Sequence, residues 1–100
     1  DLAQKQKSID LICEEADKYS QRGYLVEARN ILENGLKKYP DNLDLICELM
    51  HVSFRQKADR NCLEEAITWG EKILEQSNNE QQRHSAIQVL CFSYRCWKIG

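Results

Sequence analysis

Proline and glycine are scarce in this sequence, which has one proline and four glycines among 100 residues. The glycines, Gly23, Gly35, Gly70 and Gly100, are isolated from one another. A loop that binds phosphate groups through its backbone amides needs several glycines close together. The sequence therefore excludes a phosphate-binding loop of that class.

Long apolar runs and an excess of basic charge are also missing. The uncharged apolar stretches are only a few residues long, whereas a membrane-spanning helix needs about 20, and the N-terminus is polar, unlike a signal sequence. The formal net charge is −2, with basic and acidic residues interleaved. Since nucleic-acid binding requires a basic face to neutralise phosphates, we expect this chain to bind neither a membrane nor nucleic acid.

The five cysteines form no recognisable disulfide framework. Their number is odd, and they lie within helix-like apolar patterns rather than in loops. We expect them to be small apolar side chains in the core or in a groove, without a disulfide, in a reducing cytoplasm. The five are Cys13, Cys47, Cys62, Cys91 and Cys96.

No group of residues has the spacing of a catalytic or metal site. His51 has no second histidine four residues away, so the zinc-protease helix motif is absent. Cys91 and Cys96 are five residues apart, which places them on different sides of a helix, and His84 with Cys91 would still lack two ligands. We expect no catalytic residue, no metal and no cofactor, and we do not expect the chain to be an enzyme.

An internal repeat sets the architecture. The pentapeptide Asp10-Leu11-Ile12-Cys13-Glu14 recurs without change as Asp44-Leu45-Ile46-Cys47-Glu48, and the two copies are 34 residues apart. A period of 34 residues is typical of helix-turn-helix repeats. We therefore expect stacked helix pairs.

Apolar spacing and helix-ending residues predict five helices and no strand. Gly23 ends the first helix and Pro40 follows the second. Asp41 and Asn42 supply side chains that can begin the third helix, and Asn61 supplies one for the fourth. The predicted inward side chains of the last helix are Ile87, Leu90, Cys91, Tyr94 and Trp97. The predicted helices cover about residues 3–22, 24–39, 43–57, 61–76 and 81–98.

These residues resemble the tetratricopeptide repeat family, whose unit is a pair of antiparallel helices with small residues where the helices approach. In the second unit, Leu63-Glu64-Glu65-Ala66-Ile67 is similar to the usual start of the second helix, so that Ala66 corresponds to Ala28. The first unit carries the family pattern at Ala16, Tyr19, Leu25, Ala28, Leu32, Gly35 and Pro40. The resemblance implies a right-handed superhelix of antiparallel helix pairs with about five helices.

The resemblance also implies one domain over residues 1–100, with repeats at about 9–42 and 43–80 and a partial repeat at about 81–100. The sequence departs from the family pattern at Met50, where a small residue is usual, and at Gly70, where an aromatic one is usual. The register of the third repeat stays open. Aligning Gly100 with Gly23 or aligning Cys91 with Cys13 gives different inward faces.

Within this class the chain resembles the C-terminal helical region of bacterial helix-turn-helix transcriptional regulators, in segments 27–33 and 84–91. The resemblance implies a sensory or oligomerisation module whose DNA-binding domain would precede Asp1. We expect the chain to be part of a longer protein, because it begins without methionine and stops at Gly100 directly after an apolar stretch. The alternatives are a free-standing tetratricopeptide adaptor and, more distantly, a helical accessory domain of an enzyme.

In this family the first helix of each pair lines the concave groove that captures protein or peptide segments. The family's best-known peptide site clamps a carboxylate with basic side chains, whereas this surface carries three aspartates and one arginine, so a mixed or weakly basic ligand suits it better. We also expect the last helix to self-associate or to dock on a neighbouring repeat, because Cys96, Trp97 and Ile99 would form an apolar edge. The predicted groove residues are Asp10, Cys13, Asp17, Ser20, Gln21, Asp44, Cys47, His51, Phe54 and Arg55.

Overall fold

The computed structural model describes the backbone of residues 2–56 and 59–99 and the side chains of residues 3–56 and 59–95. These residues form five α-helices and no strand, which confirms the predicted all-α fold, and each helix end lies within two residues of its predicted place. The helices are α1 (Leu2–Gln21), α2 (Leu25–Lys38), α3 (Leu43–Arg55), α4 (Arg60–Gln76) and α5 (Glu80–Ile99). None of the helices in the described ranges is long and apolar enough to span a membrane.

Local backbone chemistry explains where the helices begin and end. Gly23 has φ +89°, and the Tyr24 amide donates to the Tyr19 carbonyl at 2.9 Å, which is the hydrogen bond that closes a glycine-terminated helix. Of the two predicted caps of α3, Asn42 begins the helix, because its side-chain oxygen accepts from the Leu45 amide at 3.1 Å. The expected role of Asn61 is wrong, since Asp59 accepts from the Asn61 amide at 2.9 Å and α4 begins at Arg60.

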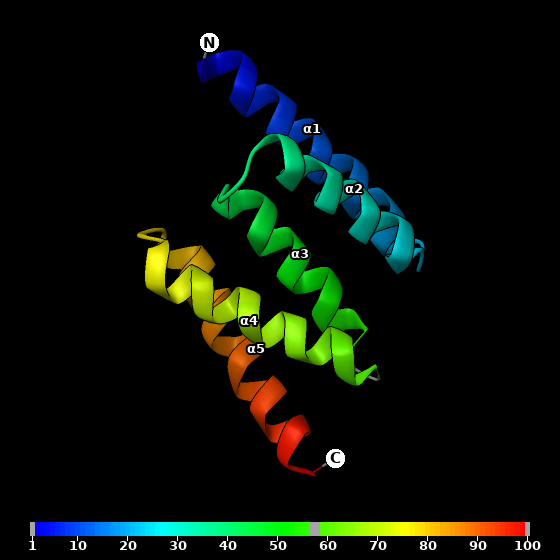
Figure 1. The fold of residues 1–100 in the computed structure, drawn as a ribbon, viewed down its shortest axis with the longest axis vertical. Helices are drawn as coiled ribbons and strands as arrows, with labels where there is room; N and C mark the ends of the chain where they lie inside the picture. Colours follow the sequence, from blue (N-terminus) through cyan, green and yellow to red (C-terminus); the bar gives the residue numbers. More distant parts are fainter. Residues whose placement is uncertain (1, 57–58, 100) are drawn as a thin grey trace.

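Successive helices pack antiparallel in an elongated stack that measures 46 × 30 × 20 Å (Figure 1). The central helix, α3, contacts all four other helices. Since α1 and α5 both contact α3, the odd-numbered helices form one layer, and α2 and α4 cover the other side. This arrangement of adjacent helix pairs is that of a helical repeat.

Two apolar clusters share α3. Ala28 and Ala66, the predicted close-approach positions, are both fully buried, and each belongs to a different cluster. Met50 is also fully buried although a small residue is usual there, because Gly70 lies opposite: a Cβ at Gly70 would be 3.5 Å from the Met50 sulfur and 3.1 Å from Leu90 Cγ. The large side chain at Met50 and the missing one at Gly70 therefore compensate for each other.

Among the described side chains, which do not include that of Trp97, the predicted inward face of α5 is wrong except at Leu90. The buried residues are instead Ala86, Val89, Leu90 and Ser93, while Ile87 is 48% exposed, Tyr94 is 49% exposed and Cys91 is exposed. Apolar residues lie on two sides of this helix, and up to Arg95 only the side that contacts α3 and α4 is covered. The side chains of Cys96, Trp97 and Ile99 lie outside the described residues, so the predicted apolar edge at those positions stays a prediction.

The third unit aligns with the second by its helix start and by its buried positions. α3 begins at Leu43 and α5 begins at Glu80, 37 residues later. With this offset the buried residues Leu49 and Val52 correspond to the buried residues Ala86 and Val89. Met50 then corresponds to Ile87.

Candidate functional site

Four of the predicted groove residues line a single groove between the odd-numbered helices. Asp10 and Cys13 come from α1, and Asp44 and Cys47 come from α3. The groove has a volume of about 390 Å³. The residues that complete its lining are Glu48, Asn79, Gln81, Gln82 and Ser85.

Hydrogen bonds across the groove orient its carboxylates. The Gln82 side-chain amide of α5 donates to Asp44 at 2.7 Å. On the opposite wall, Gln6 of α1 donates to Asp10 at 3.0 Å and lies 3.5 Å from the second Asp44 oxygen. Asp44 is therefore held between α1 and α5, which makes the groove preformed.

The electrostatic character of the groove is acidic. Burial and the neighbouring Asp17 and Asp44 carboxylates raise the pKa of Glu48, and Arg55 opposes them only in part. Burial, together with Glu48, Asp44 and Asp10, raises the pKa of the Cys13 thiol to about 12. Among the described residues that line the groove there is no lysine or arginine. The site therefore favours a positively charged group.

The same electrostatics make the groove cysteines poor nucleophiles. Cys47 resembles Cys13, because burial and then Glu48 and Asp44 raise its pKa to about 11. Both thiols are consequently protonated at neutral pH, whereas reactive cysteines need a lowered pKa. In the described part of the chain, no three or more His, Cys, Asp or Glu side chains are placed to hold a metal ion.

The other predicted residues lie further along the same face, beyond the groove. Arg55 donates to the buried Ser20 hydroxyl at 2.6 Å, which links α3 to α1. Gln21 donates to Asp17 at 2.8 Å on α1. His51 is half-buried on α3, and burial followed by the Arg55 charge lowers its pKa.

An aromatic pair closes this end of the face. The ring of Phe54 lies 6.3 Å from the ring of Phe92 on α5, and the two planes are inclined by 43°. Phe92 is 53% exposed. The face therefore combines an acidic groove near the N-terminal ends of α3 and α5 with an accessible aromatic ring near the other end.

The groove residues on α5 were not predicted from the sequence, because the alignment of the third repeat with the first two was left open. Gln81, Ser85 and Phe92 lie four and seven residues apart, which places them on one helix face. The break at residues 77–79 gives the signal that could have found them, since it sets the start of α5. Glu48 was also missed, although it directly follows Cys47 and shares its helix face with Asp44.

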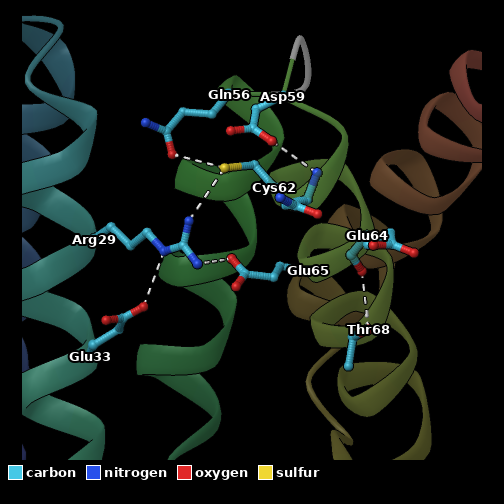
Figure 2. Close-up of polar contacts among 9 residues, drawn as sticks. Arg29, Glu33, Gln56, Asp59, Cys62, Glu64, Glu65 and Thr68 are labelled. Carbon is cyan, nitrogen blue, oxygen red and sulfur yellow. Dashed lines mark hydrogen bonds and ion pairs between the residues drawn. The ribbon is translucent and has the colours of Figure 1, made fainter.

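On the other layer, polar contacts join the two helix pairs (Figure 2). Arg29 of α2 forms ion pairs with Glu33, at 3.1 Å, and with Glu65 of α4. A further Arg29 nitrogen lies 3.3 Å from the buried Cys62 sulfur, which in turn lies 3.5 Å from the Gln56 side-chain oxygen. This network holds α2 and α4 in place and does not contribute to the groove.

Comparison of the chain with models of protein families, with curated proteins and with solved structures finds no match.

Proposed function

We propose that this chain is a protein-interaction module that binds a basic segment of another protein in the groove between α1, α3 and α5. The observation that carries the proposal is the concentration of Asp10, Asp44 and Glu48 in a preformed groove whose described lining has no basic side chain. An arginine or lysine of the partner would supply the missing positive charge.

The energetics favour such a ligand. Glu48 is half-buried among other carboxylates, so its charge is poorly compensated in the free protein. A guanidinium or ammonium group placed beside it would form a charge-assisted hydrogen bond, which is stronger than a neutral one. Because the groove is already built by helix packing, little conformational entropy is lost on binding.

The aromatic pair gives the bound segment a direction. A partner whose basic side chain enters the groove could place an apolar side chain on the exposed ring of Phe92, further along the same face. Aromatic anchors contribute strongly to binding when a partner covers them. The proposed ligand is therefore an amphipathic segment with a basic residue at one end and an apolar residue at the other.

For the cellular setting, we propose the cytoplasm and a role as the sensory or oligomerisation part of a transcriptional regulator. The resemblance of segments 27–33 and 84–91 to such regulators supports this proposal. A free-standing adaptor is the alternative. The encoded sequence before Asp1 separates the two: a helix-turn-helix pattern there supports the regulator, and further repeats support the adaptor.

Fluorescence anisotropy tests the binding proposal. One labelled peptide carries central arginines and an apolar residue, and a second has glutamates in place of the arginines. The basic peptide should bind, and added salt should weaken it. Glu48→Gln should weaken binding by about 10- to 150-fold, since a hydrogen bond to a charged group contributes about 1.5–3 kcal/mol.

The matched control is Glu27→Gln, which removes the same charge from an exposed position on α2. This variant should bind the basic peptide as the original chain does. Equal affinity of the two variants, or equal binding of the acidic peptide, would show that the groove is not the binding site.

A further inference from the structure

A second surface lies on the outward side of α5, away from the acidic groove. Ile87, Cys91 and Tyr94 are spaced by four and three residues, so they form one stripe along the helix. Ile87 and Tyr94 are 48% and 49% exposed, and Cys91 is exposed. Figure 1 shows α5 at the end of the stack, next to α4.

Comparison with the equivalent helix, α3, indicates what kind of element would pack on this stripe. Ile87 corresponds to Met50, which is fully buried because α4 packs on α3 and brings Gly70 against it. The same packing recurs between α1 and α2, where Ala16 and Ala28 are buried. The stripe on α5 is therefore the surface on which a repeat of this type places an antiparallel helix.

The neighbouring surface of α4 adds a charge requirement. Tyr94 lines an apolar hollow of about 240 Å³ together with Glu64, Ile67 and Thr68, and its hydroxyl donates to Glu71 at 2.6 Å. Glu64, Glu71 and Glu75 are spaced by seven and four residues, so they share one side of α4. A helix that covers the α5 stripe would lie beside this acidic edge of α4. Such a helix needs its own apolar stripe to pack on α5 and a basic residue beside that stripe to face the glutamates.

The α5 helix of another molecule has both features. Arg95 is exposed and lies four residues after Cys91, on the same side as the apolar stripe. If two α5 helices pack antiparallel with the two Cys91 residues facing each other, Arg95 of one copy lies level with Ile87 of the other. Gly70 of α4 faces Leu90 of α5 and the two helices are antiparallel, so this level falls between Glu71 and Glu75 of α4.

We propose that two copies of this chain pair through this stripe, with α5 packed antiparallel on α5 about a two-fold axis near Cys91. Such a symmetric interface uses the same surface on both copies, which is the commonest arrangement in homodimers. The contact buries apolar side chains that are exposed in the single chain, and it pairs Arg95 with the acidic edge of α4. It is separate from the acidic groove and does not rest on its proposed function.

Sedimentation equilibrium over low to high micromolar concentrations tests the proposal. The original chain should form a dimer, and Ile87→Glu should shift it to a monomer by placing a charge in the interface. The matched control is Val26→Glu, since Val26 is an equally apolar residue on α2 and is 58% exposed. This control should still dimerise.

Oxidative cross-linking with a copper complex tests the geometry in the same samples. The oxidant takes two electrons from two Cys91 thiols, two protons are released and one disulfide forms between the copies. The covalent dimer should be lost in Cys91→Ser. A monomeric original chain at the highest concentration, equal disruption by Val26→Glu, or cross-linking that persists in Cys91→Ser would overturn the proposal.

Discussion

α3 and α5 occupy equivalent places in the repeat but differ in what covers them. α3 contacts all four other helices and is buried on two sides, so that Ile46 and Met50 are nearly inaccessible. Within the described residues, α5 contacts only α3 and α4, and its Ile87 remains half exposed. The comparison shows that apolar spacing identifies a helix with two apolar sides, whereas the neighbouring helices decide which side is buried.

The largest expected difference between these two helices is the cost of removing equivalent apolar side chains. Met50→Ala should lower the free energy of unfolding by about 2–5 kcal/mol, because it leaves a cavity opposite Gly70. Ile87→Ala should change it by no more than about 0.5 kcal/mol at concentrations where the chain is monomeric. Urea unfolding of both variants measures the difference. Similar costs at the two positions would mean that α5 is covered as α3 is.

The buried side of α5 should be as sensitive to overpacking as the core of the second unit. Ala66 on α4 and Ala86 on α5 are both fully buried in the same cluster. Replacing either with Leu should overpack the cluster and cost about 1–3 kcal/mol. Gln88→Leu, at an exposed position of α5, serves as the control for thermal melting. If Ala86→Leu had the same melting temperature as Gln88→Leu, the assigned register of α5 would be wrong.

A smaller effect concerns the groove, where Glu48 of α3 corresponds to Ser85 of α5. The pKa of Glu48 is raised above its ordinary value of 4.5 by burial and by Asp17, so folding favours the protonated carboxyl. Its contribution to stability is complete below pH 4.5 and is lost as the pH rises through the raised pKa. Glu48→Gln should therefore be more stable than the original chain near neutral pH, and this advantage should shrink below pH 4.5.

Thermal melts at the two pH values measure this advantage. Ser85→Ala is the uncharged comparison at the equivalent position, and its effect should not change with pH. If Glu48→Gln were stabilised by the same amount at acidic pH as at neutral pH, the cause would be packing rather than charge.

The sequence predicted the helices and four of the nine groove residues for identifiable reasons. The repeated pentapeptide placed Asp10 and Asp44 in equivalent positions of α1 and α3, and the structure brings both to one groove. Ala28 and Ala66 were predictable because the resemblance to the tetratricopeptide pattern implies small residues where paired helices approach. These features depend on local spacing, which a single sequence contains.

The rest depends on tertiary contacts that local spacing does not contain. The exposed side of α5 could not be chosen, since Ile87 and Ala86 are both apolar and only the contact with α3 and α4 separates them. Asp59 competes with Asn61 for the start of α4, and both side chains have the chemistry to begin a helix. The contact of Gln82 with Asp44 requires two helices separated by the whole of α4.

The groove is tested most directly by recording amide NMR spectra of the isotope-labelled chain while the basic, arginine-containing peptide is added. Binding in the acidic groove predicts that the amide signals of Cys47 and Glu48 on α3 and of Ser85 on α5 shift in proportion to occupancy, while those of Val26 and Glu27 on α2 stay in place. Shifts concentrated on α2, or unchanged groove signals at peptide concentrations that saturate binding, would contradict the assignment of the groove as the binding site.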